Sequence, residues 1–196
     1  MTQMDADAYK RRVAGARARV AGQTFEGAIE ASCKWYEIRG ELKADKTPEP
    51  MKPLGKPNAK GQFLACFTKK AQVDFSGTMI GGRSIRFEAK QTNTDRFERG
   101  RLTDQQMENL LGHYEMGARC FVLLCFGLTH FYRVPWEVWD DMKAIYGRQY
   151  VTEEDLTQYR IPYEGGIIKF MDGIPFDLGG FRYKRRDDED DEEVDV

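Results

Sequence analysis

Hydrophobic residues recur every three or four positions near the start of the chain, over residues 22–38. This spacing is typical of a helix that packs on a core through one face. The apolar stripe consists of Phe25, Ala28, Ile29, Cys33 and Tyr36. Glu26 and Glu30 lie beside that stripe, one helical turn apart, and not within it.

A second helix is predicted from about residue 103 to residue 116, where local start signals are strong. Thr103 and Gln106 have the spacing of a capping box, in which each residue satisfies a backbone N–H of the other. Leu102 and Met107 have the spacing of a hydrophobic staple across the same helix start.

Two other patterns predict strands. Residues 120–126 (CFVLLCF) are apolar without interruption, as in a strand that is buried on both faces. Residues 129–134 (THFYRV) alternate and are predicted to pair with them across Gly127 and Leu128. Residues 73–90 (VDFSGTMIGGRSIRFEAK) read as two alternating strands joined by a glycine turn.

Weaker signals predict the remaining elements. They include a strand at residues 63–67 and a short helix that starts near Thr152 and Asp155. Pro135 is predicted to open a helix, which carries the apolar residues Trp136, Val138, Trp139, Met142 and Ile145. Residues 166–178 are predicted to form a hairpin that turns at Asp172 and Gly173. The order of helices and strands predicts an α/β sandwich with a mixed central sheet. A length of 196 residues suggests one domain, which we place at residues 22–180.

The segment between the first helix and the first strands has a different composition. Residues 39–61 hold four prolines, five lysines and few large apolar side chains, so this segment cannot form a core. We expect it to project from the domain as a loop or stalk, at about residues 42–62.

Composition limits the class of protein. Hydrophobic residues make up 41% of the chain, no apolar run is long enough to span a membrane, and the first residues lack a signal-peptide core. We therefore expect a cytoplasmic protein without a membrane partner. The four cysteines, Cys33, Cys66, Cys120 and Cys125, form no C-x-x-C pair and are accompanied by only two histidines, so buried thiols are favoured over a zinc site.

Charge is distributed unevenly. Residues 187–196 hold eight acidic and no basic residues, which leaves 24 Asp and Glu against 30 Lys and Arg in the rest of the chain. A basic body is compatible with a polyanionic partner and equally with ordinary solubility. Residues 1–21 are predicted to be a basic arm, whose cations either contact phosphates or line a solvated face. Residues 181–196 are predicted to be a disordered tail, which either solubilises the protein or competes with DNA.

The predicted hairpin at residues 73–90 places two carboxylates and an amine together. Because side chains alternate along a strand, Asp74, Glu88 and Lys90 share one face while the apolar residues share the other. A three-residue loop at residues 80–82 sets Asp74 opposite Glu88. A two-residue turn at Gly81 and Gly82 would instead set Glu88 opposite a phenylalanine.

Facing carboxylates repel each other, and a divalent cation removes that repulsion. Mg²⁺ prefers oxygen ligands, and such an ion activates water and offsets phosphate charge during phosphodiester hydrolysis. Lys90 is placed to orient the water or to stabilise the developing charge. The same three residues are also compatible with a surface salt-bridge patch.

The motifs V-D-F-x-G (from Val73), F-E-A-K (from Phe87) and a single glutamine (Gln106) before C-F-V (from Cys120) occur in a fixed order. With THFYRVP after them, this set resembles the RecU family of Holliday junction resolvases, within the PD-(D/E)xK nuclease superfamily. The similarity covers roughly residues 20–140. It implies a restriction-endonuclease-like fold with a protruding stalk that enters the open centre of a four-way junction.

The resemblance also assigns roles to individual residues. It implies that Asp74 and Glu88 are metal ligands, that Lys90 is the catalytic lysine, and that Glu26 lies close to the metal. Gln106 matches a glutamine near the active site, although its capping-box role explains it equally well.

The sequence thus predicts a Mg²⁺-dependent endonuclease, with Mn²⁺ as a substitute, that cuts four-way DNA junctions as a homodimer. Two nicks in opposed strands require two active sites, which is the reason for the dimer. A nuclease for other DNA substrates and a non-catalytic junction-binding accessory protein are the alternatives. Phosphate contacts are expected from Arg11, Arg12, Arg17, Arg19, Lys43, Lys46, Lys52, Lys56 and Lys60.

Overall fold

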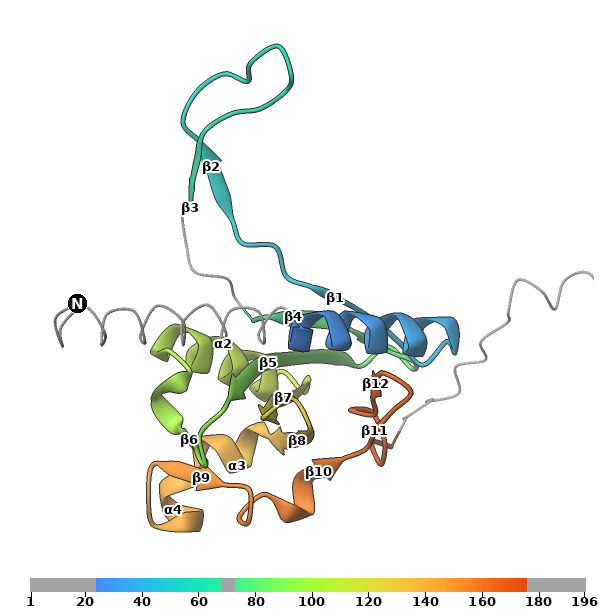
Figure 1. Cartoon of the computed structure of the whole chain (residues 1–196), viewed down its shortest axis with the longest axis vertical. Helices are drawn as coiled ribbons and strands as arrows, with labels where there is room; N and C mark the ends of the chain where they lie inside the picture. The colour runs from blue at the N-terminus through green and yellow to red at the C-terminus, as the bar shows by residue number, and fades with distance from the viewer. Residues whose placement is uncertain (1–23, 68–72, 176–196) are drawn as a thin grey trace, which may run out of the picture.

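The computed structural model describes residues 24–67 and 73–175 (Figure 1). The predicted basic arm, with Arg11, Arg12, Arg17 and Arg19, and the predicted acidic tail lie outside these residues. The described part of the chain has a mixed central sheet with strand order β1-β4-β5-β7-β8-β10, in which β5 and β7 run parallel and the other neighbours antiparallel. Its strands are β1 (Leu42–Lys46), β4 (Phe75–Met79), β5 (Ser84–Thr92), β7 (Arg119–Phe126), β8 (His130–Pro135) and β10 (Arg160–Ile161).

Helices and short two-stranded sheets cover both faces of this sheet. One face packs against a helix at residues 24–38 and the chain that contains β11 (Tyr163–Glu164) and β12 (Ile167–Ile168). The other face packs against α2 (Asp104–Glu115), α3 (Trp136–Asp140), α4 (Met142–Tyr146), β6 (Arg96–Glu98) and β9 (Tyr150–Thr152), with short 3₁₀ turns η1 (Arg99–Arg101) and η2 (Thr157–Tyr159) nearby. Alternate residues of β7 therefore enter two separate cores, which explains its continuous apolar run. The predicted fold class, an α/β protein with a mixed sheet flanked by helices and a protruding stalk, is confirmed.

Several expectations for the C-terminal third are wrong in detail. The hairpin turns at Gly165 and Gly166, which have φ values of 58° and 83°. The predicted turn at Asp172 and Gly173 is present, with the Ile174 N–H donating to the Met171 carbonyl at 3.0 Å, but it joins no pair of strands among the described residues. The second strand of this hairpin is held by the first helix, because Ser32 Oγ accepts a hydrogen bond from the Ile168 N–H at 2.8 Å. The helix after Pro135 divides at Asp141 into α3 and α4.

The hairpin of β4 and β5 has the register that the face argument requires. Phe75 pairs with Phe87, and the Met79 N–H donates to the Arg83 carbonyl at 2.8 Å, so three residues form the loop. Continuing this register places Asp74 opposite Glu88. The expectation that Val73 shares the apolar face of Phe75 is wrong: these residues belong to different cores, because β4 begins only at Phe75.

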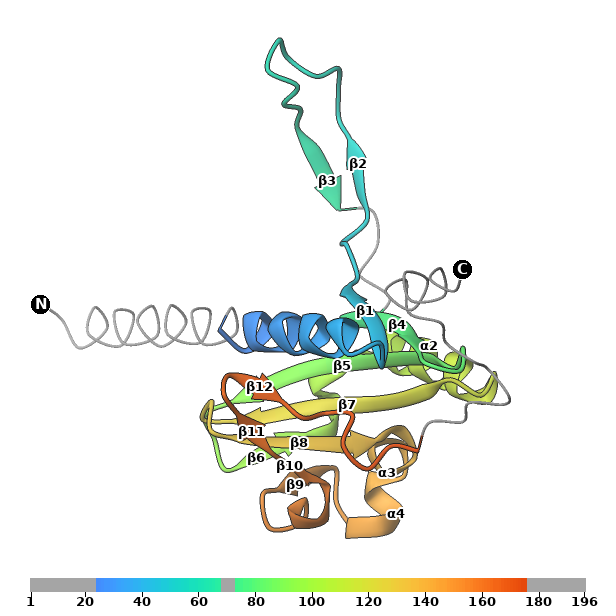
Figure 2. The same cartoon turned by 90° about the vertical axis from the view of Figure 1, so that its right-hand side faces the viewer.

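A β-hairpin projects far from the body as the predicted stalk (Figures 1 and 2). Its strands are β2 (Met51–Pro53) and β3 (Ala65–Phe67), and the Leu54 N–H continues the pairing by donating to the Leu64 carbonyl at 2.7 Å. The predicted bounds of 42–62 are wrong, because Leu42–Lys46 forms β1, an edge strand of the central sheet. The described stalk therefore runs over residues 47–67, and Lys43 and Lys46 are not part of it.

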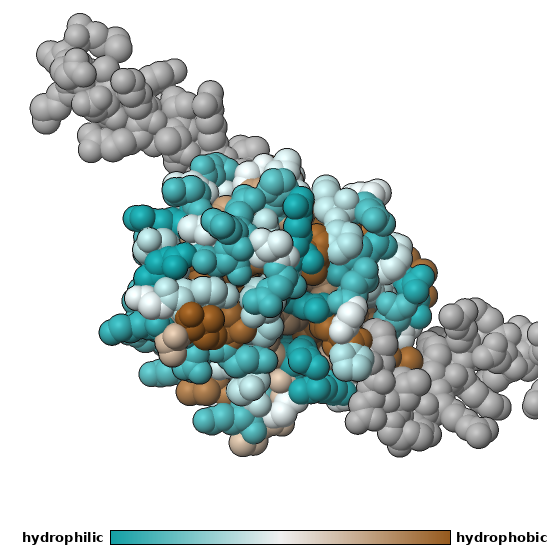
Figure 3. Space-filling model, turned by 90° about the horizontal axis from the view of Figure 1, so that it is seen from below, coloured by the Kyte–Doolittle hydropathy of each residue, from teal (hydrophilic) through white to brown (hydrophobic). Residues whose placement is uncertain are grey.

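The body of the protein has a mainly hydrophilic surface on the side away from the stalk (Figure 3). Figure 3 views the face away from the stalk, where hydrophilic residues predominate and hydrophobic patches are small and separate. Among the residues that the structure describes, no helix is long and apolar enough to cross a membrane. Cys33, Cys120 and Cys125 are buried as expected, whereas Cys66 is exposed because strand β3 belongs to the stalk.

Candidate active site

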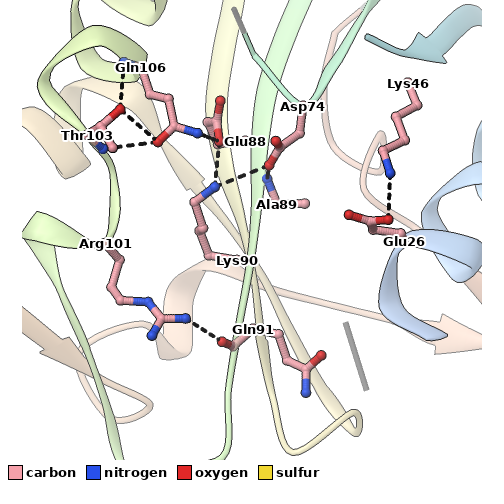
Figure 4. A network of polar contacts seen from close by, with 10 residues as sticks. All are labelled: Glu26, Lys46, Asp74, Glu88, Ala89, Lys90, Gln91, Arg101, Thr103 and Gln106. Atoms are coloured by element: carbon pink, nitrogen blue, oxygen red, sulfur yellow. Dashed lines mark hydrogen bonds and ion pairs between the residues drawn. The ribbon is translucent and has the colours of Figure 1, made fainter. Parts of the chain in front are cut away.

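Asp74 lies at the junction of the stalk and the central sheet, one residue before β4 begins. Its carbonyl accepts a hydrogen bond from the Thr47 N–H at 2.9 Å, which ties it to the first residue of the stalk. Its carboxylate turns toward β5, where Oδ2 accepts the Ala89 N–H at 2.9 Å and the Lys90 ammonium at 3.3 Å (Figure 4). The strand therefore fixes the direction in which this carboxylate points.

Glu88 is a fully buried carboxylate, with an exposed fraction of 0%. Its Oε2 accepts hydrogen bonds from Lys90 Nζ at 2.6 Å and from Gln106 Nε2 at 2.7 Å. Its Oε1 is buried and has no hydrogen-bond partner among the described residues. Burial, together with the charge of Asp74, raises the pKa of Glu88 to about 8, although the Lys90 ammonium acts in the opposite direction.

Lys90 Nζ lies between the two carboxylates and contacts both. Burial alone would lower the pKa of Lys90, but the nearby charges of Asp74 and Glu88 outweigh burial, so the pKa is raised. Lys90 is therefore a cation and a hydrogen-bond donor at neutral pH. Of the predicted site residues, the structure brings Asp74, Glu88, Lys90 and Gln106 together.

Gln106 takes part in the capping box of α2 and also contacts Glu88. Its Oε1 accepts the Thr103 N–H at 3.0 Å, and its own N–H donates to Thr103 Oγ1 at 3.3 Å, which completes the capping box of α2. Its Nε2 donates to Glu88 at the same time. The start of α2 thus positions the amide that holds the buried carboxylate (Figure 4).

Glu26 does not contact the other carboxylates. Its Oε2 accepts a hydrogen bond from Lys46 Nζ at 2.6 Å, from the helix at residues 24–38 across to β1. In Figure 4 this pair lies on the far side of Asp74 from Glu88. Its expected place near a metal ion therefore stays a prediction.

The expected phosphate contacts divide into two groups. Lys52, Lys56 and Lys60 lie on the exposed stalk, and none of them forms an ion pair with a residue in the described ranges. Lys43 pairs with Glu37 and Asp45, at 3.1 and 3.2 Å, and Lys46 pairs with Glu26. The positive charges of the three stalk lysines are therefore not balanced by ion pairs within the described residues, whereas those of Lys43 and Lys46 on β1 are.

The donor chemistry fits a hard divalent cation. Two carboxylates converge, and the orphaned Oε1 of Glu88 is a buried acceptor that a cation would satisfy. Within the described residues, no three His, Cys, Asp or Glu side chains form a metal-binding group. Asp74 and Glu88 would supply carboxylate oxygens to such an ion, with water and substrate phosphate as further ligands, as is usual for Mg²⁺.

Comparison with known proteins identifies one family. The model of one protein family, RecU (Recombination protein U), matches residues 20–174. The chain belongs to the RecU family. No curated protein sequence matches it. Among solved structures, the Holliday junction resolvase Hjc from Archaeoglobus fulgidus is similar at a TM-score of 0.40 and 13% identity, covering 66% of this chain and 90% of that one.

Membership of the RecU family extends beyond the region that the motifs cover. The match reaches residue 174, whereas the sequence motifs ended near residue 140. The additional part includes β10 to β12 and the chain that packs on the first helix, where the Tyr36 hydroxyl accepts the Met171 N–H at 3.0 Å. The strands of this part are only two residues long, and its hairpin turns at two glycines that were not predicted to form a turn. The sequence therefore shows no motif of the family there.

Proposed function

We propose that this protein is a Mg²⁺-dependent endodeoxyribonuclease that resolves four-way DNA junctions, with Mn²⁺ as a substitute ion. The observation that carries the proposal is the contact of Lys90 with both Asp74 and Glu88, where Glu88 also accepts a hydrogen bond from Gln106. Membership of a family described as Recombination protein U supports DNA as the substrate.

Each residue has a distinct task in phosphodiester hydrolysis. Asp74 and Glu88 would hold the cation, which lowers the pKa of water and offsets charge on the phosphate when it is bound. Lys90 would donate hydrogen bonds to the attacking water or to the phosphate oxygens, where negative charge grows in the transition state. Gln106 would keep the Glu88 carboxylate in place and leave its Oε1 directed at the cation. Glu26 would contribute only after exchanging its ion pair with Lys46.

The stalk supports a branched substrate. The backbone bond between Thr47 and Asp74 joins the base of the stalk to the site, so a DNA strand at the stalk also approaches the carboxylates. Lys52, Lys56 and Lys60 would attract phosphates on the way. A junction resolvase must cut two opposed strands, and we therefore propose a homodimer with one site in each subunit.

Cleavage of a labelled synthetic four-way junction tests the proposal. The wild-type protein would be compared with Asp74→Ala and with Glu115→Ala, which removes an exposed carboxylate at the end of α2. We expect paired symmetric nicks in Mg²⁺, none in EDTA, and none with Asp74→Ala. The Glu115→Ala variant should cut like the wild type.

Two other results would redirect the proposal. Equal cutting of linear duplex would preserve the chemistry and indicate a nuclease for other DNA substrates. Tight junction binding by wild type and Asp74→Ala, without cutting in any metal, would indicate a recombination accessory protein.

A further inference from the structure

Three arginines lie close together in the sequence, in β6 and η1, and two of them have acidic partners. Arg96 pairs with Glu98 at 2.8 Å, and Arg99 pairs with Asp140 at 2.8 Å. Arg101 forms no ion pair with any residue in the described ranges. It is exposed, and its charge is therefore available to another molecule.

Arg101 is anchored on the strand that carries the site. Its Nη2 donates to the Gln91 carbonyl at 3.0 Å, one residue beyond Lys90 (Figure 4). Alternate residues of a strand present their backbone groups to the same side, so this carbonyl faces the side of β5 from which Asp74 takes the Ala89 N–H. Asp74 and Arg101 therefore contact the same side of β5, at Ala89 and Gln91, and Lys90 lies between these two residues in the strand.

We infer that Arg101 binds a backbone phosphate of the DNA strand being cut, next to the phosphate at Lys90. This inference rests on the proposed function. A guanidinium has five N–H donors in a planar fork that matches phosphate oxygens, and the anchoring bond to Gln91 uses one of them. The anchor fixes the side chain beforehand, which reduces the entropy lost when a phosphate binds.

Charge around the site gives Arg101 a specific task. The Asp74 carboxylate repels an approaching phosphate, and Lys90 is already engaged with both Asp74 and Glu88. A cation outside this network attracts the strand without competing for the carboxylates. Arg101 would therefore set the register of the strand, so that one phosphate reaches the site.

The test measures junction binding in EDTA over a range of salt concentrations, and then single-turnover cleavage in Mg²⁺ at saturating protein. The variants are Arg101→Ala and Arg101→Lys, with Arg96→Ala as the matched control from the same segment. For Arg101→Ala we expect the slope of log affinity against log salt to fall by about 0.9, the value for one lost phosphate contact. Cleavage should fall about ten-fold, because a loosely held strand reaches the site less often.

Arg101→Lys should restore the salt slope, since the charge is kept, but only part of the cleavage rate, since the fork is lost. Thermal unfolding of each variant would show that an exposed substitution leaves the fold intact. An Arg101→Ala protein with the wild-type slope and rate, or one matched by Arg96→Ala, would overturn the inference while leaving the proposed nuclease in place. Failure of the wild-type protein to bind or cut any DNA would instead defeat both proposals.

Discussion

Gln106 donates a hydrogen bond from Nε2 to Glu88 Oε2 at 2.7 Å while its Oε1 caps the helix that carries it. A single amide therefore joins the start of α2 to the carboxylate at the centre of the site. Glu88 needs this support because it is fully buried, and a buried carboxylate is costly unless it is hydrogen-bonded. Helix capping and site geometry are consequently coupled in this protein.

The two functions of Gln106 can be separated by substitution. Gln106→Glu keeps the acceptor that the capping box requires but replaces the donor to Glu88 with a carboxylate oxygen. We expect junction cleavage to fall at least ten-fold, which corresponds to about 1.4 kcal/mol in the barrier. Single-turnover cleavage and thermal unfolding, measured on the same preparation, would check this.

The control for that experiment is Thr103→Ala, which removes the cap and leaves the Nε2 donor. It should cost about 1 kcal/mol of stability and leave the cleavage rate within about two-fold of wild type. If both variants lost activity in proportion to their stability, Gln106 would act only as part of the cap.

Stability of the metal-free protein should depend on pH through Glu88. The pKa of Glu88 is about 8 in the folded state and near 4.5 when unfolded, so the folded protein binds one more proton between these values. Stability is therefore greatest at low pH in this window and falls as pH rises toward 8, by at most about 1.4 kcal/mol per pH unit. Glu88→Gln cannot titrate and should lack this contribution.

Urea unfolding in EDTA at pH 5.5, 7 and 8.5 provides the measurement. The stability difference between Glu88→Gln and wild type should grow in favour of the variant as pH rises. Groups that do not interact with Glu88 titrate alike in both proteins and cancel, and the raised pKa of Lys90 keeps it charged over this pH range. Parallel stability curves for the two proteins would contradict a raised pKa for Glu88.

The sequence predicted that Asp74, Glu88 and Lys90 lie close together, because local rules control this arrangement. Alternation along β5 and the glycine loop before it determine that Asp74, Glu88 and Lys90 meet. The same sequence could not decide what Gln106 does, because the capping box uses Oε1 and the site uses Nε2. The capping-box spacing predicts only the hydrogen bond of Oε1 and carries no information about Nε2.

Contacts between distant segments were beyond prediction. β1 looked like the start of the stalk because its lysines match those of residues 47–67, yet it pairs with β4, about 30 residues later. The same pairing brings Lys46 to Glu26. Arg101 was missed for a related reason: nothing local distinguishes it from Arg96, and only the fold shows which arginine reaches Gln91.

The stalk lysines should contribute to DNA affinity and not to stability. Replacing Lys52, Lys56 and Lys60 together by Ala removes three cations, and we expect the salt slope of junction binding to fall by up to about 2.7. Thermal unfolding should be unchanged, since the stalk lies outside both cores. Electrophoretic mobility shift with four-way and linear DNA would measure the affinity.

A double variant of Lys43 and Lys46 to Ala is the comparison for the stalk. These lysines are ion-paired on β1, so their removal should change the salt slope less per cation. An equal loss per cation from both sets would show that overall charge, and not the stalk, determines affinity.

Gly77 should be essential to the edge of the sheet that carries the stalk. A Cβ at this position would lie 2.2 Å from the Lys43 carbonyl and 2.6 Å from the Ala44 side chain, which are parts of the neighbouring strand β1. Gly77→Ala would therefore push β1 away from β4 and, with it, the base of the stalk. We expect a loss of stability of about 1–3 kcal/mol, as for other overpacked sites, measured by urea unfolding.

Gly55→Ala is the control, because no atom lies within 4 Å of a Cβ there, and it should unfold like wild type. A Gly77→Ala protein as stable as Gly55→Ala would mean that β1 is not held against β4 in solution.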